Sequence, residues 1–378
     1  MKKVLVATNS FGIGGLETNV LELVTGIKKS GKYDPVVISS GGDFVSFLEQ
    51  DNIKHYNVHL NDKNPLFYIG TLYKINKIIK EEKIELIHSH ARIPSFVFTL
   101  MLKKYCIPLI TTVHYPYKIN FIYKFMSKWG DKVITVSKDL ADYVLDNYYV
   151  RNKDVSIVVN GIDTDKFGIN VSNKDILLKH NISEDSNRIV HISRLDKCTC
   201  KTIDLLIDLF YELDNKIDNL VLIIVGDGTE YRRLLKKAQL VNDKLGREAI
   251  KFIGKVCGDV HKYTSLATLF IGVSRSALEA MSEKKCVILS GDFGYLGFFN
   301  KDKLEKAVKT NFCCRTESGV RKNILKKDII NYFNHMTKEE KEKMGKYNRS
   351  VVLKYFSKGK MVKDVCDIYD DMLDINKK

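Results

Sequence analysis

Proline, tryptophan and long apolar runs are scarce in this chain of 378 residues. It has five prolines and one tryptophan, and no proline follows Pro116, so proline does not mark a linker in the later part of the chain. No apolar run approaches the roughly 20 residues that span a bilayer. The basic start Met1-Lys2-Lys3 is followed by only four apolar residues, too few for a secretory signal. We therefore expect a cytoplasmic protein without membrane-spanning helices.

The cysteines also lack a metal-site pattern. Eight are present, but Cys198-Thr199-Cys200 and Cys313-Cys314 do not have the C-x-x-C spacing, and no second ligand pair lies nearby. Two histidines and a carboxylate at metal-ligand spacing are absent as well. We expect free, mostly buried thiols, no bound metal and no cofactor.

Acidic residues are fewer than basic ones, 46 against 61. The formal net charge is +15, which favours anionic partners such as phosphorylated small molecules or anionic lipid headgroups. A nucleic-acid-binding protein is an alternative, but no zinc-finger, RRM or KH signature accompanies the charge.

What is present is a regular alternation of short apolar strands and longer amphipathic segments, typical of parallel sheets with crossover helices. A helix is expected over 66–83, and the predicted strands are 3–7, 35–39, 84–88, 107–112, 132–136, 155–159, 188–193, 220–225, 250–253, 268–271 and 286–289. The length suggests two α/β domains, each a Rossmann-like, doubly wound sheet, facing each other across a cleft.

The expected boundaries are 1–167 for the first domain, 168–355 for the second domain and 356–378 for a C-terminal segment. The first boundary is placed by the polar stretch 167–187. In the last segment a helix over 359–375 carries Met361, Val365, Ile368 and Met372 on one face, and we expect it to cross back to the first domain.

Residues suited to binding anions follow several predicted strands. Ligands of open parallel sheets bind beyond the carboxyl ends of the strands. The run Gly12 to Glu17 follows the first strand, but it is not a dinucleotide fingerprint, because Glu17 stands where the third glycine is needed. Ser39-Ser40, rather than an acidic residue, end the second strand. A hydride-transfer enzyme is therefore disfavoured, although Gly14 and Gly15 still permit close approach of a ligand or simply form a tight turn.

Other strand ends carry single residues with two interpretations each. His114 closes a strand and could bond a substrate hydroxyl or carbonyl, or be a structural histidine, as could His88 and His90. Arg194 with Lys197 or Lys201 could clamp a diphosphate, or Arg194 could pair with Asp196 at the surface. Glu279 stands at an expected helix start, where it could accept the hydroxyls of a ribose or interact with the helix dipole.

Together these pieces resemble the GT-B-fold retaining glycosyltransferases of family 4, also described as glycosyl transferases group 1. The matching motifs span nearly the whole chain and occur in the family's order: Gly14-Gly15-Leu16-Glu17, Thr112-Val113-His114, Val133 to Ser137, Asn160 to Asp163 with Phe167, Ser193-Arg194-Leu195, Val225 to Gly228 and Ala277 to Met281.

The resemblance implies a donor site and a mechanism. A nucleotide sugar, UDP-linked rather than GDP-linked, would be held mainly by the second domain, with transfer that retains the anomeric configuration and needs no metal. The implied catalytic residues are His114, Arg194 and Lys201. The implied donor-binding residues are Gly14, Gly15, Arg194, Lys197, Lys201, Gly226, Asp227, Gly228, Ser274 and Glu279.

The chain departs from the family pattern at two positions. The family usually has a second glutamate eight residues before the ribose-binding one, and Ile271 stands there. This leaves open a catalytically inactive, nucleotide-sugar-binding relative. The usual lysine, five residues after the arginine, is replaced by Thr199, and we prefer Lys201 over Lys197 because an apparent helix follows it.

The segment 117–132 points to the acceptor. It combines Phe121, Ile122, Phe125, Met126 and Trp129 with four lysines, as does a helix that rests on a membrane; an ordinary helix packed on the sheet is the alternative. The expected function is hexosyl transfer to a glycan or lipid-linked glycan in surface polysaccharide biosynthesis, by a cytoplasmic enzyme with peripheral attachment to the inner face of the membrane.

Overall fold

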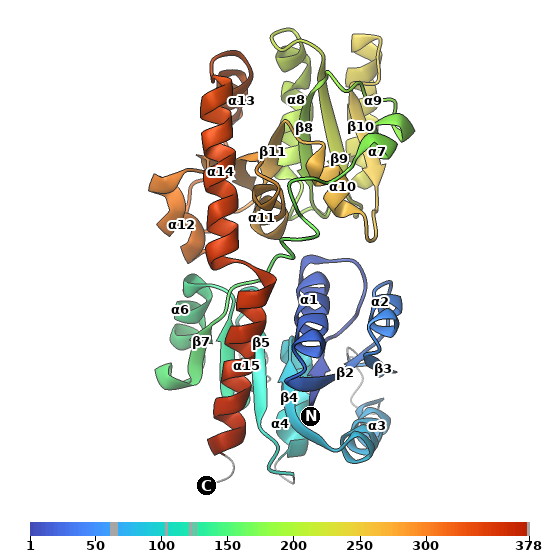
Figure 1. Ribbon diagram of the computed structural model, residues 1–378, viewed down its shortest axis with the longest axis vertical. Helices are drawn as coiled ribbons and strands as arrows, with labels where there is room; N and C mark the ends of the chain where they lie inside the picture. The colour runs from blue at the N-terminus through green and yellow to red at the C-terminus, as the bar shows by residue number, and fades with distance from the viewer. Residues whose placement is uncertain (61–66, 103–104, 121–123, 125–126, 376–378) are drawn as a thin grey trace. The chain divides into compact units, whose positions relative to one another are not determined.

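The computed structural model describes residues 1–60, 67–102, 105–120, 124 and 127–375. Two compact units divide these residues: unit 1 runs from Met1 to Gly161 and resumes at Lys358, and unit 2 is Ile162–Ser357 (Figure 1). Residues 162–167, which the sequence placed in the first domain, belong to unit 2. The reason is Phe167, which is buried there and whose carbonyl accepts a hydrogen bond of 2.7 Å from Ser282 Oγ.

Unit 1 is built on a seven-stranded parallel sheet with the order β3-β2-β1-β4-β5-β6-β7. Central strands of such a sheet are covered on both faces and are therefore apolar, as Val4, Leu5 and Val6 illustrate with no exposed surface. The strands are β1 (Lys2–Ala7), β2 (Tyr33–Ser39), β3 (Lys54–Asn57), β4 (Ile84–Ser89), β5 (Leu109–Val113), β6 (Lys132–Thr135) and β7 (Val155–Ile157).

Helices connect the strands of unit 1 as crossovers. Their apolar faces cover the sheet; Ile75, Ile78 and Ile79, for example, are buried at the helical spacing seen in the sequence. The helices are α1 (Gly15–Ser30), α2 (Val45–Gln50), α3 (Phe67–Glu82), α4 (Arg92–Leu102), α6 (Lys138–Asn147), the short 3₁₀ turn η1 (Asn152–Asp154) and α15 (Lys358–Ile375).

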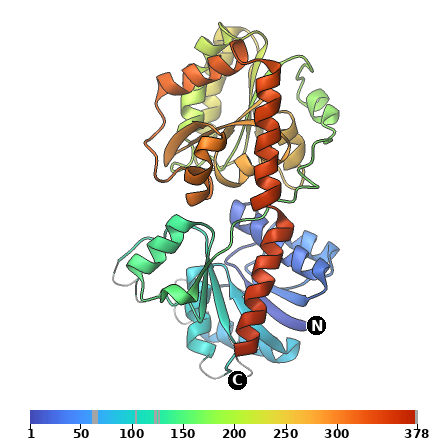
Figure 2. The same ribbon diagram turned by 60° about the vertical axis from the view of Figure 1, so that its left-hand side comes forward.

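The last helix, α15, completes the core of unit 1. Met361, Val365 and Met372 are buried together with residues of β1 and α1, and Ile368 packs against the same cluster. Figure 2 shows the helix lying over the sheet of this unit. The buried Tyr369 adds an edge-to-face contact with Tyr33, at 5.3 Å between ring centroids. The final described helix is therefore an integral part of the first sheet's packing.

Unit 2 is built on a six-stranded sheet with the order β10-β9-β8-β11-β12-β13, parallel except for the antiparallel edge pair β12–β13. The strands are β8 (Asn187–Ile192), β9 (Leu220–Val225), β10 (Ile250–Gly254), β11 (Leu269–Gly272), β12 (Cys286–Gly291) and β13 (Gly294–Phe298). The helical elements are α7 (Lys174–Lys179), α8 (Lys201–Asp214), α9 (Tyr231–Leu245), α10 (Val260–Ser265), α11 (Ser274–Ser282), η2 (Lys301–Lys303), α12 (Leu304–Lys309), α13 (Lys322–Asn334) and α14 (Lys338–Tyr355).

These two sheets confirm the predicted GT-B type of α/β fold, with two doubly wound domains. Every strand range expected from the sequence overlaps an observed strand. Two strands were not expected: β3 is a short polar edge strand, and β13 contains two glycines and follows a tight turn.

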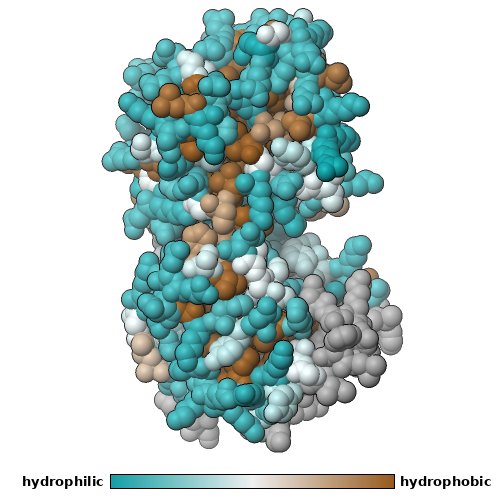
Figure 3. Space-filling model, turned by 90° about the vertical axis from the view of Figure 1, so that its right-hand side faces the viewer, coloured by the Kyte–Doolittle hydropathy of each residue, from teal (hydrophilic) through white to brown (hydrophobic). Residues whose placement is uncertain are grey.

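Both sheets contain a switch point, where successive connections leave in opposite directions. In unit 1 it lies between β1 and β4, and in unit 2 between β8 and β11. The carboxyl ends of neighbouring strands diverge there and leave a crevice for ligands. Among the described helices, none combines the length and the apolar character needed to cross a bilayer. Hydrophilic side chains predominate on the face seen in Figure 3, with smaller hydrophobic groups between them.

Candidate functional site

At the carboxyl edge of the unit 2 sheet, backbone hydrogen bonds join the loops that follow β8 and β9. The Leu195 N–H donates to the Asp227 carbonyl at 3.0 Å, and the Glu230 N–H donates to the Leu195 carbonyl at 2.8 Å. Gly226 has φ +144°, and a Cβ on Gly228 would lie 2.5 Å from the Leu195 carbonyl carbon. The predicted motifs around Arg194 and Gly226 to Gly228 therefore form one rigid platform, and the glycines are required by its packing.

Arg194 projects from this platform. Its side chain is 71% exposed, and its Nε lies 3.8 Å from Asp196 Oδ2, so the predicted surface pair exists but is long and solvated. Exposed pairs of this kind contribute about 0–1 kcal/mol, and such a contact does not prevent the guanidinium from binding an anion. Lys197 and Lys201 are also exposed, in the turn and at the first position of α8. The structure thus brings three cationic side chains to the same strand end.

The turn between β12 and β13 adds a residue that sequence reasoning missed. Asp292 Oδ1 accepts a hydrogen bond of 3.0 Å from the N–H of Lys201 and so satisfies an open donor at the start of α8. Burial raises the pKa of this carboxyl group. The signal in the sequence was Gly291-Asp292-Phe293-Gly294, a typical turn motif that follows a predicted strand.

The connection from β11 to α11 is a single residue, Val273. Helix α11 begins at Ser274, whose φ of 56° is unusual for a residue with a side chain and whose N–H donates to the Phe312 carbonyl at 2.8 Å. Strained positions of this kind cluster at functional sites. Ile271 lies within β11 and is completely buried in the core. Counting eight residues back from Glu279 therefore reaches a core position of the strand.

Glu279 is not at the helix start, contrary to the expectation. It lies in the second turn of α11, is 5% exposed, and accepts a hydrogen bond of 2.8 Å from Nε of the equally buried Arg275. The short β11–α11 connection moves the helix start back to Ser274, and this explains the difference. Arg275, four residues earlier on the same face, was missed; its spacing to Glu279 was the available signal.

A buried histidine supports the switch point of unit 2. His191 on β8 contacts the Ile271 carbonyl through Nδ1 at 2.7 Å and Ser193 Oγ through Nε2 at 2.9 Å. Since a carbonyl only accepts, Nδ1 carries the hydrogen, and Ser193 donates to Nε2. Burial lowers the pKa of His191 to about 4. This histidine joins β8 to β11 and orients the residue that precedes Arg194.

In unit 1, the loop after β1 leads directly into α1. Gly14 precedes the first helical residue, Gly15, and a Cβ on Gly14 would lie 2.3 Å from Glu17 Oε2. The Glu17 carboxylate, which also accepts from Ser10 Oγ at 3.2 Å, therefore folds over the start of the helix. The positive end of the α1 dipole is thus partly compensated by Glu17.

Three histidines meet at the other side of this switch point. His90 follows β4, and its Nδ1 lies 3.0 Å from Nε2 of His114, which follows β5 and is partly exposed. The His88 ring lies 4.2 Å from the His90 ring, between centroids. Burial lowers the pKa of His114 to about 4 and that of His88 to about 3. All three rings are therefore neutral near pH 7.

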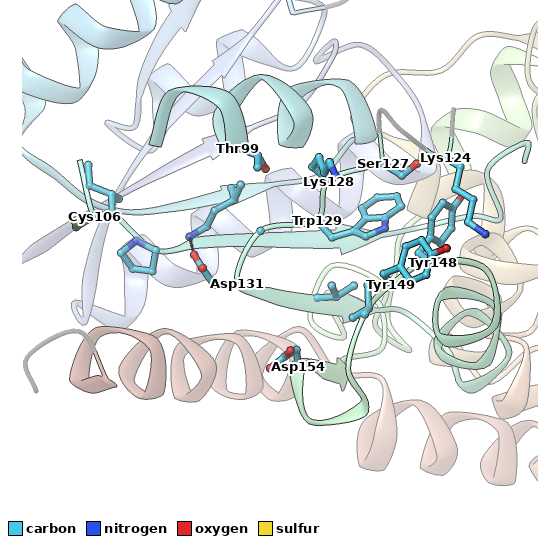
Figure 4. A pocket seen from close by; sticks show the side chains of 16 residues that line it. Thr99, Cys106, Lys124, Ser127, Lys128, Trp129, Asp131, Tyr148, Tyr149 and Asp154 are labelled. Atoms are coloured by element: carbon cyan, nitrogen blue, oxygen red, sulfur yellow. Dashed lines mark hydrogen bonds between the residues drawn. The ribbon is translucent and has the colours of Figure 1, made fainter. Parts of the chain in front are cut away.

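A cavity of about 520 Å³ lies at the opposite, amino edge of the unit 1 sheet (Figure 4). Its lining includes Leu109 at the start of β5 and Asp131 and Asp154, which directly precede β6 and β7. It is therefore separate from the histidines at the carboxyl edge. Trp129 contributes to the lining but is 5% exposed and packs edge-to-face on Tyr148 at 5.1 Å.

Of the helix expected over 117–132, residues 121–123 and 125–126 lie outside the described residues, and with them Phe121, Ile122, Phe125 and Met126. The described residues 117–120 and 127–131 are not helical. Of its predicted apolar surface, only Trp129 is described, and it is a core residue.

All eight cysteines are free thiols, as expected. Four of them are buried, so the expectation that most would be buried is not met. Within the described ranges, no group of three or more histidine, cysteine, aspartate or glutamate residues is placed to hold a metal ion.

Two family models match the chain in succession. The model described as Glycosyltransferase Family 4 matches residues 13–166, and that described as Glycosyl transferases group 1 matches residues 172–351. An uncharacterized glycosyltransferase of Methanocaldococcus jannaschii, MJ1178, is 28% identical over 346 residues, which cover 86% of this chain and 87% of that protein.

Solved structures share the fold. A glycosyltransferase from Rickettsia africae superposes with a TM-score of 0.80 at 21% identity, covering 98% of both chains. Anabaena Alr3699/HepE, in complex with UDP and glucose, superposes with a TM-score of 0.75 at 16% identity, covering 98% of this chain and all of that one.

Proposed function

The chain belongs to the group 1 glycosyltransferases of the family 4 type, and from this premise we propose that it transfers a hexose from a UDP-sugar to a glycan or lipid-linked glycan acceptor, with retention of configuration. The proposal is supported most directly by one observation. Arg194, Lys197 and Lys201 share a strand end at the unit 2 switch point, beside the closely packed Gly226 to Gly228 turn.

Arg194 and Lys201 would bind the diphosphate of the donor. When the bond between the anomeric carbon and the phosphate oxygen breaks, the electron pair and the negative charge move to the diphosphate. A guanidinium fork and an ammonium group at that position stabilise the developing charge. We assign the leaving-group stabilisation to these side chains and propose transfer without a metal ion.

The remaining donor contacts are assigned by position. Gly226, Asp227 and Gly228 would approach the nucleoside, and Ser274 the phosphates, with its unusual φ at the start of α11. Glu279 would accept the ribose hydroxyls; its carboxylate is already oriented by Arg275. In unit 1, Gly14 and Gly15 would contact phosphate or acceptor, and His114 the transferred sugar.

The preference for UDP rests on similarity. HepE, whose fold this chain shares, was solved with UDP and glucose. The test is calorimetric titration of the protein with UDP and with GDP, no metal added. We expect UDP to bind, Arg194→Ala to weaken binding at least tenfold, and Arg232→Ala, an exposed arginine on α9, to bind as the wild type does. If both variants bind UDP as the wild type does, the diphosphate role of Arg194 is contradicted.

Turnover separates an enzyme from an inactive relative. Ile271 is a core residue of β11, and no glutamate stands between it and Glu279, so turnover decides between an enzyme and an inactive relative. We expect UDP release from a UDP-hexose in the presence of acceptor glycans. UDP binding without turnover on any glycan or lipid-linked glycan would favour the inactive relative.

A lipid-linked acceptor would require approach to a membrane. Tyr115 and Ile119, which follow His114 closely, are 48% and 47% exposed, and Lys118 between them is exposed as well. Aromatic, aliphatic and cationic side chains together suit a membrane interface. We expect the wild-type protein to sediment with anionic vesicles. The double variant Lys118→Glu/Ile119→Asp should bind the vesicles about tenfold less, and the control variant Lys74→Glu on α3 should bind them as the wild type does. Equal binding by all three proteins would contradict this surface.

A further inference from the structure

Three histidines at the unit 1 switch point, His88, His90 and His114, form a continuous series, and the side chains of Tyr369 and Thr112 flank its buried end. Tyr369 of α15 contacts His88 Nδ1 through its hydroxyl group at 2.7 Å, and Thr112 Oγ1 contacts His88 Nε2 at 2.7 Å. The His88 ring is therefore held on both nitrogens. It packs against His90 at 4.2 Å between centroids, with the planes 35° apart. His90 in turn contacts His114.

The hydrogen positions follow from the surroundings of His90. Its Nε2 is buried and has no hydrogen-bond partner among the described residues, whereas its Nδ1 lies 3.0 Å from His114 Nε2. A neutral imidazole carries one hydrogen, on one of its two nitrogens. A buried N–H without an acceptor is rarer than an acceptor without a donor, and costs about 1–3 kcal/mol. The hydrogen of His90 therefore resides on Nδ1 and is donated to His114.

We propose that His90 is a positioning residue that fixes the tautomer of His114: His114 accepts at Nε2 and presents its Nδ1–H as a hydrogen-bond donor. Resting on the proposed function, this means that His114 donates to an oxygen of the transferred sugar and does not accept a proton from it. A hydroxyl or ring oxygen of the hexose, rather than a substrate N–H, is the group it recognises.

The neutral state of both rings supports this assignment. Protonation of His114 would place a hydrogen on Nε2 that points at the N–H of His90. Burial already lowers the pKa of His90 well below its usual range, with His88 and His114 adding to the effect. The pair therefore keeps a single hydrogen between the two rings, and the donor role of His114 Nδ1 persists through the neutral pH range.

The test is a long-range ¹H–¹⁵N correlation spectrum of the full chain labelled in its nine histidines. His114→Gln identifies the His114 signals by their disappearance. We expect a protonated Nδ1 and an unprotonated Nε2 in wild-type His114. The reverse tautomer, or a mixture of the two in equal amounts, would overturn the proposal.

Two variants at His90 provide the functional measurement. His90→Leu removes the donor, whereas His90→Asn keeps an amide N–H at the position of Nδ1. In the leucine variant we expect His114 to lose its single tautomer and kcat to fall about tenfold, while the affinity for UDP stays within twofold of wild type. In the asparagine variant we expect the single tautomer and kcat to be restored. A leucine variant that keeps tautomer and kcat would overturn the role of His90.

The spectrum also separates this proposal from the proposed function. The tautomer is measured without substrate, so it stands or falls independently of turnover. His114→Ala with unchanged turnover would overturn the sugar contact, whereas the wrong tautomer would overturn the role of His90 even in an active enzyme.

Discussion

A Cβ atom on Gly226 would lie 1.9 Å from the carbonyl oxygen of Ser193, a distance that real Cβ atoms essentially never show. The neighbour is backbone, so no side chain can rotate away. The backbone of Gly226 also has φ +144°, which residues with side chains rarely adopt. The contact between the ends of β8 and β9, on which Arg194 stands, therefore depends on glycine.

Gly226→Ala is expected to lower the free energy of unfolding by about 3 kcal/mol, because clash and strain act together. Gly246→Ala is the matched control: its φ of +67° is also positive, but no atom lies within 4 Å of the added Cβ. We expect a cost of about 1 kcal/mol there. Urea unfolding followed by circular dichroism measures both, and equal costs would contradict the close packing of the two loops.

Lys201→Ala is expected to weaken UDP binding about 10- to 100-fold, the loss typical of a charge-assisted hydrogen bond. Lys197→Ala removes the same charge from the neighbouring turn and should weaken binding less than about threefold. Titration calorimetry distinguishes the two. A larger effect at Lys197 would reverse our preference for Lys201 as the diphosphate lysine.

Asp292→Ala is expected to lower the free energy of unfolding by about 1 kcal/mol, since the Lys201 N–H at the start of α8 would lose its acceptor. Asp292→Asn keeps an oxygen at that position and should cost less. Both are compared by urea unfolding. An asparagine variant as unstable as the alanine variant would show that charge, rather than the hydrogen bond, is what matters.

His88 makes the unfolding of the protein pH-dependent. Its native pKa is about 3, against about 6.5 in an unfolded chain, so below pH 6.5 the unfolded state binds a proton that the native state excludes. Above pH 6.5 the titration of His88 does not reduce the free energy of unfolding. Between pH 6.5 and pH 3 it lowers this free energy by about 1.4 kcal/mol per pH unit.

His88→Gln removes this titration while keeping a side chain that donates and accepts hydrogen bonds. We expect the variant to be less stable than wild type at pH 7, and the difference to shrink on acidification to pH 5. Urea unfolding at pH 7, 6 and 5 gives the comparison. A difference that stays constant with pH would contradict the burial of a neutral His88.

The positions of most strands were predictable because buried parallel strands are short, apolar and separated by amphipathic helices. The edge strand β3 was not, since its Lys54-His55-Tyr56-Asn57 has no apolar run. Gly14 and Gly226 were recognisable as glycines that follow predicted strands, where a neighbouring group can approach the chain closely. Their partners, Glu17 and Ser193, were not, because these contacts depend on tertiary packing.

The site residues show the same division. His90 and His114 both attracted attention as strand-end residues, but nothing in the sequence indicates that their nitrogens meet, because β4 and β5 become neighbours only in the sheet. The burial of Glu279 against Arg275 was also hidden. The sequence predicted Glu279 at a helix start, whereas α11 begins five residues earlier, because one residue separates β11 from α11.

The packing of α15 on the first sheet has a consequence for synthesis. The buried faces of Met361, Val365 and Tyr369 belong to the core of unit 1, although nearly 200 residues of unit 2 are translated before them. A ribosome therefore completes the whole of unit 2 while unit 1 still exposes the surface that α15 will cover. The half of the protein that is made first is the half that finishes folding last, and a chain released early, after Ser357, would carry that uncovered surface permanently.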